Sequence, residues 1–155
     1  QMSTGEDQFR RALYIYWKRT APYPSMITYD GGAREVCVTR RIRTNTPLQA
    51  LTTLNDSTYL VMARQFAYQM QEHGGKEVNK QIQKGYETML YKPISEKRLS
   101  ALVELYKSSI NKFRKDETAT CEMIGVMNKH NHPETAALVV VANAMLNLDE
   151  WVNKN

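Results

Sequence analysis

The chain has 155 residues, of which 42% are hydrophobic and 24% are charged, with seven glycines and five prolines. This composition is typical of a globular protein and does not indicate disorder or a repeat array. The 21 basic and 16 acidic residues give a net charge of +5, but the basic residues are spread along the chain. A nucleic-acid binder is expected to concentrate them in a stripe with aromatic residues on the same face, so that class is not indicated.

The length suits a single domain over residues 1–155. Residues 1–10 are polar and charged, so they do not resemble a signal peptide. The longest near-continuous apolar run, residues 136–146, has 11 residues. A membrane span needs about twenty, so this run predicts a core helix. Because the chain starts abruptly, shortly before a helical pattern, we expect it to be the C-terminal fragment of a larger protein.

The first part of the chain predicts one helix followed by a long loop. Apolar residues recur at helical spacing over residues 6–19, and the pattern ends before Pro22. Residues 20–46 show no helical period, and residues 35–42 alternate weakly, as an extended segment would. A loop of this length is either functional or a strap over the core.

The rest of the chain predicts helices with clear ends. A helical pattern covers residues 47–71 with a break at Asn55-Asp56, and Asp56 is placed to cap the second part. Further helices are predicted over residues 78–91, from Ser95 to about residue 115, more weakly over 116–129, and from Pro133 onward. The last is apolar on nearly all sides, so we expect the others to surround it. The predicted fold is all-α, an irregular bundle of five to seven helices with a long, partly extended loop between the first and second.

The most distinctive stretch precedes residue 47. Arg40, Arg41 and Arg43 place three guanidinium groups within four residues. Thr46, Pro47 and Gln49 form a capping box with proline at the first helical position. Cations beside a helix N-terminus predict an anion site formed by the three arginines and Thr46. In the structural alternative, the arginines pair with carboxylates or with helix-end carbonyl groups.

Other candidate sites are weaker. Cys37 and Cys121 could form one disulfide or remain two buried thiols. Neither begins a C-x-x-C-H pattern, so the sequence predicts no haem attachment in this chain. His130 and His132 lack a convincing third ligand, and we expect no metal site. The methionines are predicted to fill the core. No catalytic motif is present in the sequence, so it predicts neither an enzyme nor catalytic residues.

Several stretches of the sequence are distinctive when taken together. They are Phe9–Tyr14, Trp17–Thr20, Pro24–Met26, Tyr29-Asp30, Arg34–Cys37, Arg43–Leu51, Leu54–Asp56 and Leu146–Glu150. In combination they resemble the planctomycete-specific domain one, a domain of unknown function. The family often has proline after Asn-Asp, whereas this chain has Ser57. The resemblance implies the C-terminus of an exported protein of Planctomycetes, related environmental bacteria or some Bacteroidetes, located in the periplasm or cell envelope. It also implies a cytochrome c-like upstream segment, which would hold any haem c.

Three functions are consistent with these observations. The first is a non-catalytic module that binds the upstream domains of the same polypeptide or an envelope protein. The second is an anion-binding or acidic, sulfated carbohydrate-binding module that uses the arginine cluster. The third is an accessory domain of a redox or hydrolytic enzyme, which rests on the family neighbourhood alone.

Overall fold

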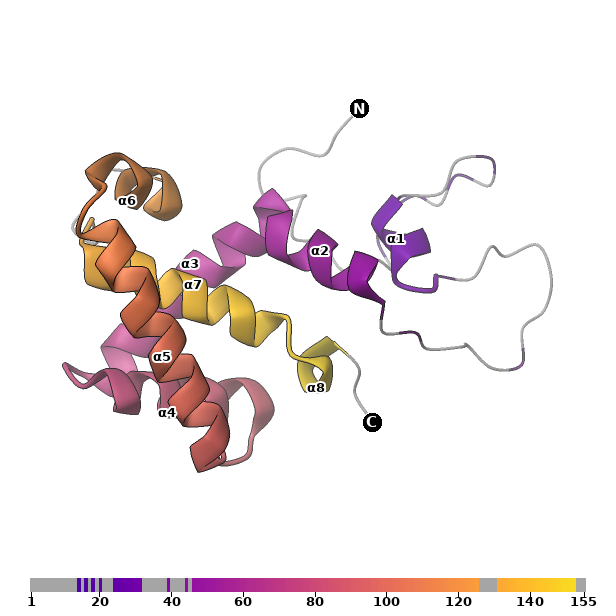
Figure 1. The fold of residues 1–155 in the computed structure, drawn as a ribbon. Coiled ribbons are helices and arrows are strands. Elements are labelled where there is room, and N and C mark those ends of the chain that lie inside the picture. The colour runs from indigo at the N-terminus through magenta and orange to yellow at the C-terminus, as the bar shows by residue number, and fades with distance from the viewer. Residues whose placement is uncertain are drawn as a thin grey trace. The chain divides into compact units, whose positions relative to one another are not determined.

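The computed structural model describes residues 24–31, 46–125 and 131–152, together with Tyr14, Tyr16, Lys18, Thr20, Thr39 and Thr44. Within this part the chain forms eight α-helices and no strand (Figure 1), which confirms the all-α prediction. It divides into two compact units, residues Gln1–Thr58 and Tyr59–Asn155. The prediction of a single domain stays a prediction, because this division does not show whether either unit folds alone.

The first unit contains a short helix that the sequence pattern did not predict. Helix α1 covers Pro24–Thr28 and ends where Asp30 adopts a left-handed conformation with φ of 56°. The amide of Gly31 donates to the carbonyl of Met26 at 2.6 Å and closes the turn. The prediction of a loop without helix over residues 20–46 was therefore wrong, since five residues are too few to show a helical period.

Much of the predicted N-terminal helix and loop lies outside the described residues. Of the predicted helix over residues 6–19, Tyr14, Tyr16 and Lys18 are described, and neither Tyr16 nor Lys18 lies in a helix. The weakly alternating segment 35–42 also lies outside the described residues, apart from Thr39.

Helix α2 covers Pro47–Asn55 and confirms the predicted capping box. The Thr46 hydroxyl accepts from the Gln49 amide at 3.3 Å, and the Gln49 side-chain oxygen accepts from the Thr46 amide at 3.0 Å. The helix ends at Asp56, whose carboxylate accepts from the Thr58 amide at 2.8 Å. The predicted break and cap at Asp56 are thus both present, without the proline that the family often has there.

The second unit follows the predicted helix boundaries closely. Its helices are α3 Ser57–Gly74, α4 Val78–Leu90, α5 Glu96–Phe113, α6 Glu117–Ile124, α7 Pro133–Leu146 and α8 Asp149–Val152. Three of the turns between them use left-handed residues, namely Gly75, Tyr91 and Gly125. Ser95 takes the predicted N-cap position of α5, although its side chain accepts no capping hydrogen bond.

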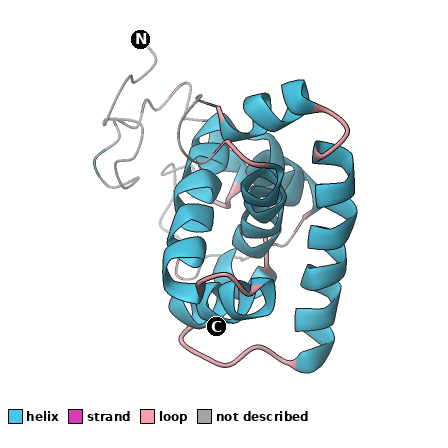
Figure 2. Ribbon diagram, turned by 90° about the vertical axis from the view of Figure 1, so that its left-hand side faces the viewer, coloured by secondary structure: helices cyan, strands magenta, loops and turns pink. Residues whose placement is uncertain are grey.

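Helix α7 is the centre of the second unit, as its sequence predicts. Residues 136–139 are completely buried, as are Val141, Ala142 and Met145. Helices α5, α6 and α8 contact it directly, and Figure 2 shows helices arranged around a central one. Gln71 of α3 donates to the Thr135 hydroxyl at 3.0 Å, which links that helix to the start of α7.

Helices α3 and α4 approach closely at Gly74 and at Gly85. A β-carbon built on Gly85 would lie 2.7 Å from the Cγ of Met70, so a larger residue there would require the methionine to move. Met70 and Met89 are buried, which confirms them as core residues. The same prediction was wrong for Met62, which is 38% exposed.

The structure corrects the end of the chain. The polar residues Asn147, Asp149 and Glu150 predict that the chain returns to solvent after α7, but residues 149–152 form helix α8. Glu150 and Trp151 are half-buried there, and Trp151 packs against the apolar core. Three residues after a central helix, this single turn brings an acidic and an aromatic side chain back onto the second unit.

Candidate functional site

A hydrogen-bonded network around Gln49 lies next to the predicted anion site. This side chain is only 3% exposed, and its amide nitrogen donates to the Thr28 carbonyl at 2.8 Å and to the Thr44 hydroxyl at 3.0 Å. The Tyr29 hydroxyl donates to the Gln49 carbonyl at 3.1 Å. Gln49 thereby ties α1 and the residues before α2 to the first turn of that helix.

Asp30 also belongs to this hydrogen-bonded network. Its carboxylate accepts from the amide and the hydroxyl of Thr44, each at 2.7 Å. These hydrogen bonds, the hydroxyl first, lower the pKa of Asp30 below its usual value of 3.8. The distinctive residues Thr44, Thr46 and Gln49 therefore have structural roles that need no ligand.

The N-terminus of α2 has few backbone amide groups that could bind an anion. Four amide groups at a helix N-terminus lack a partner within the helix. Here the Thr46 and Gln49 amides are used by the capping box, and Pro47 has no amide hydrogen. Only the Leu48 amide of these four described positions remains. Arg40, Arg41 and Arg43 lie outside the described residues, so their convergence stays a prediction.

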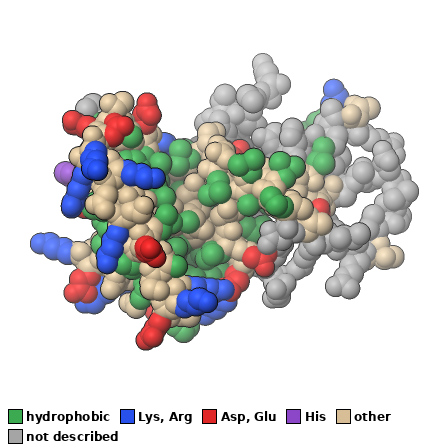
Figure 3. Space-filling model, viewed as in Figure 1, with side chains coloured by type: hydrophobic (Ala, Val, Ile, Leu, Met, Phe, Trp, Pro, Cys, Tyr) green, Lys and Arg blue, Asp and Glu red, His purple; other side chains and the backbone are tan. Residues whose placement is uncertain are grey.

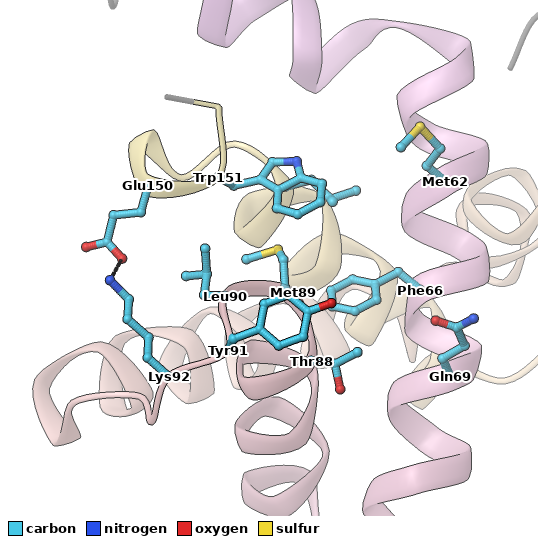
Figure 4. A pocket seen from close by; sticks show the side chains of 11 residues that line it. Met62, Phe66, Gln69, Thr88, Met89, Leu90, Tyr91, Lys92, Glu150 and Trp151 are labelled. Carbon is cyan, nitrogen blue, oxygen red and sulfur yellow. Dashed lines mark ion pairs between the residues drawn. The ribbon is translucent and has the colours of Figure 1, made fainter. Parts of the chain in front are cut away.

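A groove in the second unit is a stronger candidate. It has a volume of about 850 Å³ and is lined by residues from α3, α4, α7, α8 and the turn after α4. Its lining residues are Met62, Phe66, Gln69, Thr88, Met89, Leu90, Tyr91, Lys92, Leu146, Glu150 and Trp151. We refer to this feature as the groove (Figure 4). An apolar and aromatic lining with a few polar groups is typical of a binding site of this size.

One wall of the groove follows α3. Met62, Phe66 and Gln69 are spaced by four and three residues, so they share one helix face over about 10 Å. Trp151 and Tyr91 come from the other side of the groove (Figure 4). Tyr91 ends α4 in a left-handed conformation with φ of 55°, and its side chain is 92% exposed. The turn thus holds an aromatic ring at the rim.

A polar cluster stands at the same end of the groove. The carboxylate of Glu150 pairs with Lys92 Nζ and with Arg98 Nη2, each at 2.6 Å. Tyr86, which is 1% exposed, donates its hydroxyl hydrogen to Glu150 at 3.2 Å and accepts from Arg98 at 2.7 Å. These four residues join α4, the turn after it, α5 and α8. We refer to them as the rim cluster.

The rim cluster holds Glu150 in its ionised form. Hydrogen bonds from Arg98 first, then from Lys92 and Tyr86, lower its pKa from 4.5 to about 2. The hydrogen bonds that Arg98 donates to Glu150 and then to Tyr86 raise the pKa of Arg98 above its usual value. A carboxylate with so low a pKa is a weak base, because a general base works best with a pKa near the operating pH.

The other described site candidates, Cys121 and His132, do not line the groove. Cys121 is half-buried, and its sulfur accepts a hydrogen bond from the Asn131 side chain at 3.3 Å. Cys37 and His130 lie outside the described residues, so both readings of the cysteine pair stay predictions. His132 is exposed at the N-cap of α7. Among the described residues no three metal-ligating side chains come together.

Sequence reasoning did not find the groove. Its two walls come from residues 62–69 and 88–92, with Leu146, Glu150 and Trp151 far along the chain. The available signals were Met62 on an otherwise ordinary helix and Trp151 after an expected return to solvent. Neither residue points to the other without the fold.

The profile of PSD1, described as a protein of unknown function (DUF1553), matches residues 1–106. The chain belongs to this family. The match includes the stretch from Arg43 to Leu51 and confirms the resemblance to the planctomycete-specific domain one. The resemblance at residues 146–150 lies beyond it. No curated protein and no solved structure matches the chain. None of the described helices has the length and apolar character needed to cross a membrane.

Proposed function

We propose that this member of the PSD1 family is a non-catalytic interaction module whose groove binds an amphipathic helix of a partner polypeptide. The larger protein would be exported or periplasmic and cytochrome c-associated, as the family resemblance implies. The partner helix would belong to the upstream domains of the same polypeptide or to an envelope protein. Any haem c would lie in the upstream region.

The shape and lining of the groove carry this proposal. The α3 wall presents Met62 and Phe66 about one helical turn apart, which matches the repeat of apolar anchors on a second helix. Methionine side chains adapt to different partners because they are flexible and polarisable. Trp151 and Tyr91 add aromatic surface, which is enriched where proteins bind one another.

The rim cluster supports a binding role over catalysis. Glu150 is the carboxylate that lines the groove, and it is held ionised by Lys92 and Arg98. It can orient a partner by charge, but it is poorly suited to accept a proton at neutral pH. This argues for recognition by the residues that face the groove.

The test is association with the upstream region produced as a separate polypeptide. Isothermal titration calorimetry with the 155-residue chain is expected to show saturable binding. Met62→Glu is expected to weaken it at least tenfold, because it places a charge among apolar lining residues. Gln65→Glu is the matched control, since it adds the same charge at an exposed position of α3 that does not line the groove.

Two results would contradict the proposal. One is a lack of association at high micromolar concentration, both with the upstream region and with envelope proteins of the same organism. The other is binding that Met62→Glu and Gln65→Glu affect equally, which would place the interaction elsewhere on the chain.

A further inference from the structure

The charges of the rim cluster do not balance. Lys92 and Arg98 each carry a positive charge, and both pair with the single carboxylate of Glu150. Tyr86, the fourth member, contributes a neutral hydroxyl. The nearby exposed pair of Lys84 and Glu87 is neutral by itself, with 2.9 Å between its charged atoms. Among these four residues, one net positive charge therefore remains at the end of an apolar groove.

Lys92 is the cation of the rim cluster that a ligand in the groove could contact. It lines the groove, and its side chain is 49% exposed. An ammonium group has three donor hydrogens, and the ion pair with Glu150 uses one. Figure 4 shows Lys92 reaching toward Glu150 at the edge of the lining, so its remaining donors lie at that edge of the groove.

We propose that the groove recognises an acidic amphipathic segment, in which a carboxylate next to the apolar anchors binds Lys92. This inference rests on the proposed function and names the chemistry of the partner. The apolar anchors would occupy the space between Phe66 and Trp151. The carboxylate would balance the second cation of the rim cluster and join Glu150 as a partner of Lys92.

The geometry also gives the recognition a direction. Lys92 and Glu150 lie at one end of the lining, whereas Met62 and Gln69 lie along the α3 wall (Figure 4). The acidic residue of the partner would therefore flank its apolar anchors at one end only. Reversing the order of the anchors and the acid would weaken binding, because the charge would then lie away from Lys92.

Two fluorescent probes of nearly the same shape test this inference on the 155-residue chain. Anilinonaphthalene sulfonate has an aromatic body and an anionic group that stands in for the carboxylate. N-phenylnaphthylamine has the same aromatic body without the charge. We expect both to bind the groove, with the anionic probe binding about fivefold more tightly, the gain expected from a half-exposed ion pair. This advantage is expected to shrink as the salt concentration rises.

Three variants assign the binding to the groove and to its cation. Lys92→Gln is expected to remove the advantage of the anionic probe and to leave the neutral probe unchanged. Lys84→Gln removes an equal charge from an exposed pair outside the lining and is expected to change neither affinity. Met62→Glu is expected to weaken both probes.

The inference is overturned if the two probes bind equally and Lys92→Gln changes nothing, although an apolar groove would then remain. The inference is also overturned if neither probe binds. It is overturned as well if Met62→Glu leaves probe binding unchanged while Leu51→Ser on α2 abolishes probe binding, because the probes would then bind at the exposed leucines of α2. Because calorimetry with the upstream region tests the partner separately, a failure of the probes and a failure of the proposed function are distinguishable.

Discussion

Helices α2 and α7 show opposite relations between polarity and burial. In α7 the buried residues are apolar except for Thr135, and residues 136–139 are completely buried. In α2 the buried residues are Gln49 and Thr53, whereas Leu48, Leu51 and Leu54 are 62%, 58% and 43% exposed. The space-filling view shows hydrophobic side chains gathered over α2 (Figure 3).

The difference shows that burial in the two helices serves different purposes. Helix α7 is buried because removing its apolar surface from water stabilises the fold. The buried face of α2 instead satisfies hydrogen bonds of the preceding segment, which an apolar side chain could not do. Gln49 alone bonds to Thr28, Thr44 and Thr46.

The largest expected difference between the two helices comes from replacing one leucine by alanine in each of them. Leu138→Ala, at a position with no exposed surface, is expected to lower the free energy of unfolding by about 2–5 kcal/mol. Leu51→Ala on α2 is expected to change it by no more than about 0.5 kcal/mol. Urea denaturation followed by circular dichroism measures both. Equal costs would show that the exposed leucines of α2 are covered in solution.

A smaller effect is expected from removing the polar centre of α2. Gln49→Leu keeps the volume of the side chain but removes its hydrogen bonds to Thr28, Thr44 and Thr46, at a cost of about 1–3 kcal/mol. Hydrogen exchange of the Thr44 amide is the local measurement, since this amide donates to Asp30 within the hydrogen-bonded network around Gln49. Unchanged protection would contradict the role of Gln49. Gln65→Leu is the matched control at an exposed glutamine of α3.

Acid is expected to weaken the ionic contacts of α8 and to leave the apolar core around α7 unaffected. Because the folded-state pKa of Glu150 is about 2, below its ordinary value of 4.5, its stabilisation is present above pH 4.5. This contribution is lost as the pH falls from 4.5 toward 2. Glu150→Gln is therefore expected to flatten the dependence of stability on pH in that window, measured by thermal denaturation. An unchanged slope would show that the pairs with Arg98 and Lys92 do not form in solution.

The smallest effect is expected at the predicted anion site. Because the capping box uses the Thr46 and Gln49 amides, we expect sulfate, phosphate and sulfated or uronic oligosaccharides to give no saturable rise in melting temperature. The triple variant Arg40→Ala, Arg41→Ala, Arg43→Ala is expected to respond in the same way. A saturable rise that the variant abolishes would instead establish a site formed by the arginines.

Much of the local structure could be predicted from the sequence. The capping box at Thr46, the break at Asp56 and the helix after Ser95 depend on neighbours within one turn, so residue type and spacing are sufficient. Helix α1 was not predicted, because its five residues are too few to show an apolar repeat and its end depends on the left-handed Asp30.

The candidate site could not be predicted in the same way. The pairing of Glu150 with Lys92 and Arg98 joins residues more than fifty positions apart, and the groove begins at Met62 and ends at Trp151. No local pattern carries that information. The inverted burial of α2 was hidden for the same reason, since Leu48 and Leu51 have the spacing of a core stripe but are exposed.

The sequence by itself determined the helical class, most helix ends, the central place of α7 and the family. Each of these depends on interactions along a helix or on the apolar character of a single segment. The tertiary structure decided which apolar faces are covered, which carboxylate meets two cations, and where a groove remains. Those outcomes depend on packing between distant segments, and packing is a property of the folded chain as a whole.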